Sequence, residues 1–132
     1  MVAYNFQKQF AGDVESGKKR CTIRRAGKRL PPKDGDTLQL YTGMRTKYCR
    51  LLCKGKCTDV NPVLFTRKNG KPILCIGVIV GTEKSWIQVV ASEVERLAIE
   101  DGFKSTADFY AYFLGNSEDD FCGFLIEWEP IQ

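Results

Sequence analysis

The stretch Ser16-Gly-Lys-Lys-Arg-Cys-Thr-Ile-Arg24 decides how the first part of this chain folds. Ahead of it, from Phe6 onward, apolar side chains recur at the spacing of one helix face. Gly17 stands where a helix commonly ends, because glycine adopts the left-handed backbone of a C-terminal cap without steric cost. The stretch therefore predicts a helix over residues 7–16 that turns at Gly17 into a short strand over residues 21–24.

The side chains of this stretch combine positive charge with a hydroxyl. Strand alternation places Arg20, Thr22 and Arg24 on one face and Lys19 with Cys21 on the other, although the turn before the strand relaxes the rule at Lys19. A threonine hydroxyl among cations can bind a phosphate or carbonyl oxygen, and it can act as a nucleophile where a neutral lysine takes its proton. The like charges around Lys19 should favour its neutral amine. The stretch thus indicates an anion site and leaves a nucleophilic role open.

Positive charge is concentrated in the first half of the chain. Residues 1–71 hold 17 lysines and arginines against 5 acidic residues, whereas residues 72–132 hold 3 against 11. Between residues 18 and 33, 8 of 16 residues are basic and none is acidic, and four of those eight are arginines, which suit phosphate binding and base stacking. This asymmetry predicts a basic face for a polyanion, although a solvated basic loop would have the same composition.

The remaining pattern is typical of a mixed α+β domain. Ser92 with Glu95 forms a capping box that starts one helix, and Ser105 with Asp108 starts another. The order β-α-β-β-β-β-β-α-α-β, with no repeat or linker, predicts one domain over residues 1–132: a small β-barrel flanked by short helices. The predicted strands cover residues 2–6, 21–24, 37–41, 47–60, 73–80, 85–90 and 121–128, and the predicted helices cover residues 7–16, 92–102 and 105–115.

Two groups of side chains are expected to serve the core rather than a site. The six cysteines are interpreted as reduced thiols that pack as small apolar side chains, because no signal peptide indicates an oxidising compartment. A metal site is not expected, since the sequence has no CxxC pair and no histidine. An aromatic stripe at helical spacing is also expected in the core. The cysteines are Cys21, Cys49, Cys53, Cys57, Cys75 and Cys122, and the stripe consists of Phe109, Tyr112 and Phe113.

The sequence carries no targeting or membrane signal. No apolar run approaches the ~20 residues that a membrane helix needs, and the N-terminus lacks the apolar region of a signal peptide. We therefore expect a cytoplasmic protein that does not enter a membrane, requires no cofactor and is a monomer.

The quoted stretch resembles the G-x-K-x-x-T-I-R signature of ASCH domains, which are relatives of the PUA fold. The segments Asp34–Tyr41 and Ala98–Phe103 are similar to the family's x-G-D-x-L-x-L strand and to its acidic-Gly-Phe segment. The segment Tyr41–Lys47 is similar to ASCH proteins of bacteriophages and prophages, which would act in the host cytoplasm. The resemblance covers nearly the whole chain and implies a PUA-like barrel whose cleft, lined by the motif, binds RNA or serves an RNA-linked function.

One branch of this family, the small bacterial acetylcytidine amidohydrolases, uses a lysine, a threonine and a glutamate. Carried over by motif position, these residues are Lys19, Thr22 and an acid at Asp101 or Glu100. The resemblance implies that Lys19 activates Thr22, that Thr22 attacks the acetyl carbonyl and that the acid protonates the leaving amine. The sequence departs from this branch, because aspartate stands before Gly102 and Glu100 would point about 100° away from it on a helix.

Three functions remain open at this point. The first is binding of RNA or of a modified nucleotide in a basic cleft, which the extra basic residues favour, because a free nucleoside does not need them. The second is hydrolysis of nucleosides or RNA, by an amidohydrolase or by a metal-independent ribonuclease. The third is a phage protein that docks on a host protein. The residues predicted to contact nucleic acid are Lys18, Lys19, Arg20, Arg24, Arg25, Lys28, Arg29, Arg45 and Lys47.

Overall fold

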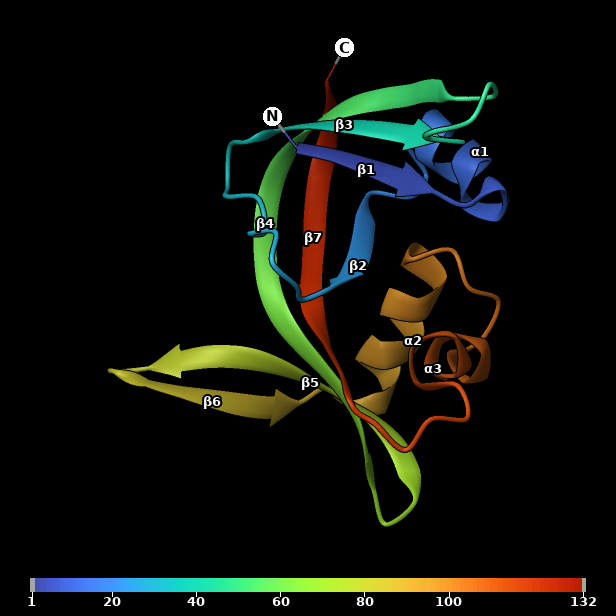
Figure 1. Ribbon diagram of the computed structural model, residues 1–132. Helices are drawn as coiled ribbons and strands as arrows, with labels where there is room; N and C mark the ends of the chain where they lie inside the picture. Colours follow the sequence, from blue (N-terminus) through green and yellow to red (C-terminus); the bar gives the residue numbers. More distant parts are fainter. Residues whose placement is uncertain (1, 132) are drawn as a thin grey trace.

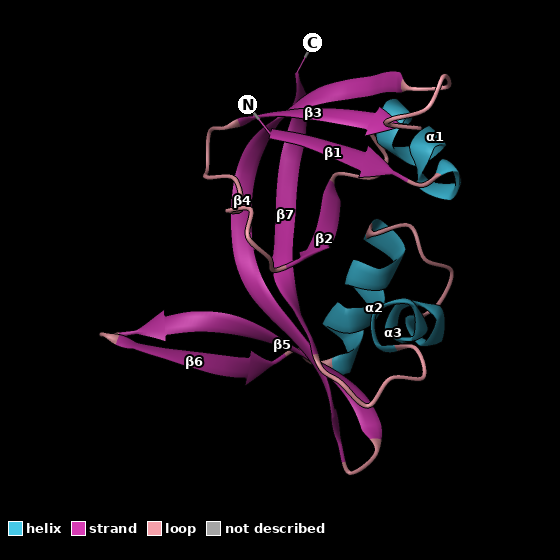
Figure 2. Cartoon of the chain, in the orientation of Figure 1, coloured by secondary structure: helices cyan, strands magenta, loops and turns pink. Residues whose placement is uncertain are grey.

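The computed structural model describes residues 2–131, and within this range it contains seven strands and three helices in the predicted order (Figure 1). The two ends of the predicted domain, residues 1 and 132, lie outside the described residues. The fold is mixed α+β, as the sequence predicts, and its strands join in one strongly curled sheet (Figure 2). The strands are β1 (Val2–Phe6), β2 (Cys21–Arg25), β3 (Thr37–Thr42), β4 (Arg50–Lys68), β5 (Lys71–Val80), β6 (Glu83–Gln88) and β7 (Phe121–Ile131), and the helices are α1 (Lys8–Ser16), α2 (Ala91–Glu100) and α3 (Thr106–Leu114).

The long strand β4 organises the sheet. It pairs antiparallel with β3, with β7 and, through its last residues, with β5. Beyond these, β1 lies parallel to β3, and β2 lies antiparallel to β7. The order β1-β3-β4-β7-β2 therefore leaves β1 and β2 as the two edges of the curled part, and these edges meet across an open seam that Arg24 and Asn5 bridge by a hydrogen bond. The curled sheet is thus a half-barrel.

Two hydrophobic clusters fill the two ends of the half-barrel. One lies under α1 and is centred on Trp128 and Leu40, and the other lies under α2 and α3 and is centred on Phe65 and Phe109. Phe103, in the connection from α2 to α3, packs against both clusters. In Figure 1, α1 and the α2–α3 pair stand at opposite ends of the same side of the sheet. The region between them is where the seam opens.

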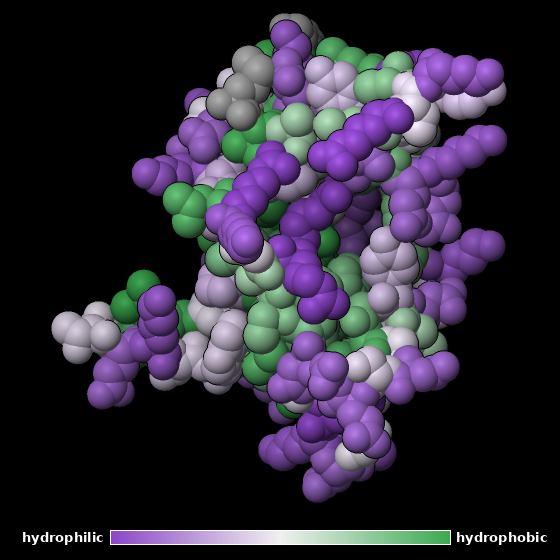
Figure 3. Space-filling model, in the orientation of Figure 1, coloured by the Kyte–Doolittle hydropathy of each residue, from purple (hydrophilic) through white to green (hydrophobic). Residues whose placement is uncertain are grey.

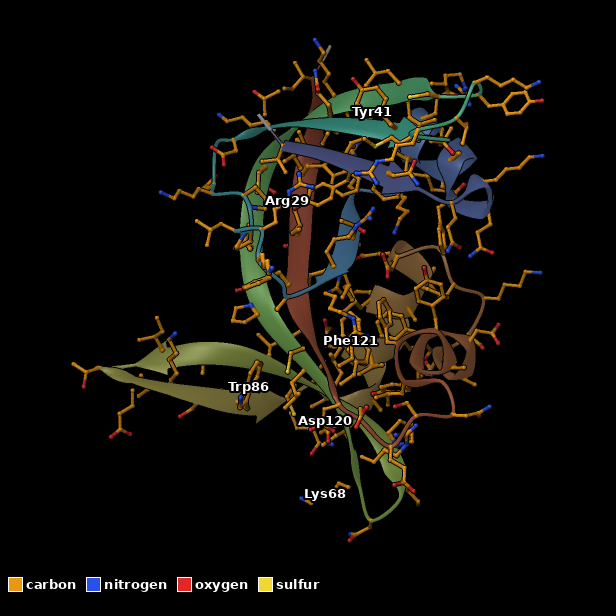
Figure 4. All side chains as sticks on the ribbon, viewed as in Figure 1. Arg29, Tyr41, Lys68, Trp86, Asp120 and Phe121 are labelled. Atoms are coloured by element: carbon orange, nitrogen blue, oxygen red, sulfur yellow. The ribbon has the colours of Figure 1, made fainter. Side chains whose placement is uncertain are left out.

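The hairpin formed by β5 and β6 projects away from this body (Figure 1). All six residues of β6 are exposed. Trp86, labelled in Figure 4, lies on this arm together with the exposed Ile79 and Ile87. The arm lies outside the seam region and provides a separate surface.

Several predicted element bounds differ from the structure. β4 continues to Lys68, eight residues beyond its predicted end, and β5 and β6 each begin two residues earlier than predicted, at Lys71 and Glu83. β4 begins at Arg50 rather than at residue 47, because residues 43–49 form a separate hydrogen-bonded loop. The capping box at Ser92 is not formed: Val90 occupies the N-cap of α2 and offers no side-chain cap. The predicted cap of α3 is confirmed, since Ser105 Oγ accepts a hydrogen bond from the backbone N–H of Asp108 at 3.1 Å.

All six cysteines are free thiols, as the sequence predicts. Packing in the core is confirmed for Cys21, Cys57 and Cys75 and is wrong for Cys49 and Cys122, which are exposed. Among residues 2–131, no helix has the length and apolar character needed to cross a bilayer.

Candidate functional site

A cavity of about 400 Å³, here called the seam cavity, opens between β1 and β2. Its lining comes from the end of β1, the start of α1, the segment around β2, the end of α2, one side of α3 and the start of β7. Figure 3 shows a hollow on this face between α1 and the α2–α3 pair, bordered by long hydrophilic side chains. The polar residues of the lining are Asn5, Gln7, Lys19, Thr22, Arg24, Arg25 and Asp101.

The turn after α1 brings Lys19 into the seam cavity. Gly17 caps α1 with φ of 83°, and the backbone N–H of Lys19 donates to the Asp13 carbonyl oxygen at 2.9 Å. Lys19 precedes β2, so the strand alternation that would separate it from Thr22 does not apply. Both side chains line the same cavity.

The Lys19 ammonium forms a buried ion pair with Asp101. Its Nζ donates to Asp101 Oδ1 and, at 2.7 Å, to the Asp101 carbonyl oxygen. Both residues are only 3% exposed. The predicted environment of like charges is wrong for Lys18 and Arg20, which are exposed while Lys19 is buried against an opposite charge; Arg24 lines the same cavity as Lys19.

The end of α2 selects between the two acids that the sequence leaves open. Gly102 has φ of 95°, and a Cβ there would lie 2.9 Å from the Phe10 ring, so glycine allows the end of α2 to approach α1 closely. This approach turns Asp101 toward the cavity. Glu100 is exposed and accepts a hydrogen bond from Arg96 Nη1 at 2.8 Å. The structure therefore brings Asp101 to Lys19 and leaves Glu100 on the outer surface of the helix.

Burial changes the acid–base properties of this corner. It raises the pKa of the Asp101 carboxyl above its ordinary value, and the Lys19 ammonium offsets only part of that effect. Burial, together with the neighbouring Asp101 carboxylate, raises the pKa of the Cys21 thiol to about 12, which makes this thiol a poor nucleophile near neutral pH. Because Lys19 and Asp101 are in direct hydrogen-bond contact, a proton can pass between them, so the pair can take part in acid–base chemistry.

Thr22 and Arg24 form the polar edge of the cavity at the seam. Arg24 Nε donates to Thr22 Oγ1 at 3.1 Å, and Arg24 Nη2 donates to the Asn5 carbonyl oxygen at 2.8 Å. The guanidinium carbon lies 4.9 Å from the centre of the Tyr4 ring and 4.8 Å from that of Phe6. Because Arg24 donates to the oxygen of Thr22, the hydroxyl proton of Thr22 remains available to a ligand.

The wall beyond these polar groups is aromatic. Tyr112 and Phe113 from α3 line the cavity together with Phe103 and Phe121. In Figure 4, Phe121 lies between the sheet and the two C-terminal helices. The guanidinium of Arg25 lies over the Phe121 ring, 4.6 Å from its centre. A flat ligand can therefore contact aromatic rings on one side and cationic or hydroxyl groups on another.

The aromatic stripe of α3 divides between core and cavity. Phe109 is fully buried, as expected for the core. Tyr112 is 49% exposed and lines the cavity, so for this residue the assignment to the core alone is wrong. The helix presents Tyr112 toward α1, where its ring packs edge-on against Phe10 and Phe103.

The other basic residues predicted to contact nucleic acid fall into three places. Lys28 and Arg29 line a second cavity that borders the first. Arg45 and Lys47 are exposed on the loop of residues 43–49. Lys18 and Arg20 are exposed and lie outside the seam cavity, and Arg20 Nε donates to the Gly17 carbonyl oxygen at 2.9 Å.

Two residues of the site, Asn5 and Tyr112, were not predicted as site residues from the sequence. Asn5 matters because its carbonyl oxygen lies on an unpaired strand edge, and an edge becomes visible only once the pairing of strands is known. Tyr112 carried a weak signal, since it flanks the buried position Phe109 on an aromatic helix face.

Comparison with known proteins gives no match: no protein-family model, no curated protein and no solved structure matches this chain. The cavity and the motif residues that line it are therefore the features that indicate a function.

Proposed function

We propose that this chain is a PUA-like domain of the ASCH type that binds RNA, or a modified nucleotide of RNA, in the seam cavity. The motif resemblance supports the family, and the half-barrel with helices at its ends is the architecture expected of it. The cavity volume of about 400 Å³ is within the range of small-ligand sites and suits a single nucleoside with its phosphate.

The observation that carries the proposal is a pair of arginines without carboxylate partners beside an aromatic wall. Within residues 2–131, Lys19 is balanced by Asp101, whereas neither Arg24 nor Arg25 lies within 4.0 Å of a carboxylate. Both guanidiniums are held against aromatic rings, which limits the entropy that they lose on binding a ligand. A phosphate supplies the missing negative charge, and a base can stack on the exposed ring of Tyr112.

Fluorescence anisotropy with a labelled single-stranded RNA tests this function. The logarithm of the association constant should fall linearly with the logarithm of the salt concentration. Arg25→Gln should weaken binding and reduce that slope, because Arg25 lines the cavity. Lys84→Gln, which removes the same charge from the β5–β6 arm, is the matched control and should change neither. Binding that is indifferent to salt, or equal losses in the two variants, would contradict the proposal.

A second candidate function, hydrolysis of an N-acylated nucleoside, is favoured by the buried Lys19–Asp101 pair in the same cavity as Thr22. The Lys19 ammonium first gives a proton to Asp101 along their hydrogen bond, and the resulting neutral amine takes the proton of Thr22 as Oγ1 attacks the acyl carbonyl carbon. The C–N bond then breaks, and Asp101 gives its proton to the leaving amine. Water hydrolyses the threonyl ester and regenerates the hydroxyl. The raised pKa of Asp101 suits its role as the proton donor.

Turnover of N4-acetylcytidine by the purified protein tests this second function. Thr22→Val, which removes the hydroxyl at nearly constant volume, should abolish turnover. Glu100→Gln should leave turnover unchanged, because Glu100 lies on the outer surface of α2. Absence of turnover by the unmodified protein with a range of acylated nucleosides would exclude this function and leave RNA binding unaffected.

A further inference from the structure

Two further cavities adjoin the seam cavity, one on each side along β1. On one side, a cavity of about 290 Å³ shares Arg24 and Arg25 with it and is also lined by Tyr4. On the other side, a cavity of about 640 Å³ shares Asn5, Phe6 and Gln7 with it. The three cavities therefore follow β1 in order, from Tyr4 to its end. The two residue steps from Tyr4 to Phe6, at ~3.3 Å each, span roughly 7 Å, about the rise from the first to the third of three successive nucleotides.

The first end cavity is built around arginines that aromatic rings hold in place. The Arg29 guanidinium carbon lies 4.8 Å from the centre of the Tyr4 ring, and its Nη2 donates to the Ala3 carbonyl oxygen at 2.8 Å. Arg24 lies over the same Tyr4 ring at 4.9 Å. Within residues 2–131, no carboxylate lies within 4.0 Å of Arg29 or Lys28, which also lines this cavity. The two arginines are oriented, and neither they nor Lys28 are compensated by a carboxylate, which is what a phosphate subsite requires.

The second end cavity is bounded by the loop of residues 43–49, which hydrogen bonds hold to the seam. Asn5 Oδ1 accepts from the backbone N–H of Met44 at 3.0 Å, while the carbonyl oxygen of the same residue accepts from Arg24. Thr46 Oγ1 accepts from the backbone N–H of Tyr48 at 3.1 Å. Tyr48 lines the cavity and is 73% exposed. The Lys47 ammonium lies over one face of its ring, 5.2 Å from the centre, which leaves the other face to stack on a base. The charge of Arg50, which also lines this cavity, is already paired with Glu15.

We propose that the three cavities form one track for single-stranded RNA of about three nucleotides, with the middle base in the seam cavity. This inference rests on the proposed function and extends it from a nucleotide pocket to a strand. The phosphates on one side lie against Arg24, Arg25 and Arg29, and the base on the other side stacks on Tyr48. A duplex does not fit this arrangement, because its bases are paired and stacked within the helix and cannot enter separate cavities.

A length series tests the track by isothermal titration calorimetry. The probes are oligouridylates, oligoadenylates and oligocytidylates of one to six nucleotides at one salt concentration. Affinity should rise to a length of about three or four nucleotides and then level off, and a duplex of six base pairs should bind more weakly than its single strands. Equal affinity for a mononucleotide and a hexamer would overturn the track while leaving the pocket intact. If no RNA of any length binds, the proposed function fails as well.

Variants at the two ends separate the track from a lone pocket. Arg29→Gln and Tyr48→Ala should each lower hexamer affinity by roughly fivefold or more and should lower mononucleotide affinity much less. Lys28→Gln, whose side chain makes no hydrogen bond to β1 within the described residues, repeats the test of the first end without risk to the fold. Lys84→Gln is the control on the arm. If all three end variants bind the hexamer as tightly as the control does, the track is wrong.

Discussion

Glu100 and Asp101 are neighbours in the chain, yet the two sides of this helix end are different environments. Glu100 lies on the outer side, where Arg96 bridges it to Glu93 and all three side chains are about half exposed. Asp101 lies on the inner side, where Lys19 is its ion-pair partner and both residues are almost fully buried. Two adjacent acidic residues therefore each form an ion pair with a basic residue, one exposed to solvent and the other buried.

The difference shows how burial changes the contribution of an ion pair to the stability of the fold. An exposed pair gains little, because water screens it and two flexible side chains must be ordered. A buried pair has already lost its hydration, so each partner depends on the other, and removal of one leaves an uncompensated charge. We therefore expect the Lys19–Asp101 pair to affect both the stability of the fold and the protonation of the seam cavity. The Arg96 pairs should have little effect on either.

The largest expected effect comes from Lys19→Met. Because the substitution leaves the Asp101 carboxyl buried without a cation, it should lower the free energy of unfolding by about 3–5 kcal/mol, measured by urea denaturation. Lys104→Met, the same chemical change at an exposed lysine just beyond α2, is the matched control and should change it by less than about 0.5 kcal/mol. If both variants lost the same free energy of unfolding, the Lys19–Asp101 pair would have to be regarded as hydrated rather than buried.

A smaller effect is expected when both partners are replaced. Lys19→Met with Asp101→Leu removes both charges and leaves no buried charge unpaired. The free energy of unfolding of this double variant should therefore exceed that of Lys19→Met by about 1 kcal/mol or more. The same denaturation experiment measures it, and a double-mutant cycle gives the coupling energy. A double variant less stable than Lys19→Met would show that the site needs the carboxylate for another contact.

Much of the fold was predictable because it follows from local pattern. The order of strands and helices is confirmed, as are the Gly17 cap of α1 and the Ser105 cap of α3, since each depends on residues close together in sequence. The predicted start of α2 was wrong, because the capping box at Ser92 is a local signal that the folded chain does not use: Val90 occupies the N-cap and offers no side-chain cap.

The site was predictable in its residue types and not in its geometry. The motif pointed to Lys19 and Thr22 and to one of two acids, but the choice of Asp101 depends on the approach of Gly102 to Phe10 across 92 residues of sequence. The open seam could not be predicted from the sequence, because a closed barrel and a half-barrel with an open edge have the same pattern of strands along the chain. Only the pairing of strands reveals that β1 and β2 are edges.

The pH dependence of stability offers a third test of the inner side. Because the pKa of Asp101 is raised in the folded protein, the folded state binds more protons than the unfolded state from about the ordinary value of 3.8 up to the raised value. Stability from this group is therefore present at low pH and is lost as pH rises through that window. Asp101→Asn should remove this decline, whereas Glu100→Gln should keep it. Glu127, whose pKa burial also raises, remains in both variants and cancels in the difference.

The smallest expected effect is that of Arg96→Ala on the outer side. Arg96 donates to Glu93 at 2.7 Å and to Glu100 at 2.8 Å, but all three side chains are about half exposed. The substitution should therefore lower the free energy of unfolding by no more than about 1 kcal/mol, and 1 M salt should remove most of that loss because exposed pairs are screened. The loss in Lys19→Met should persist in the same salt, since ions do not reach a buried pair. If both losses responded equally to salt, the contrast between the two sides of the helix end would not hold, and Lys19 would have to be regarded as a solvated residue of the cavity mouth.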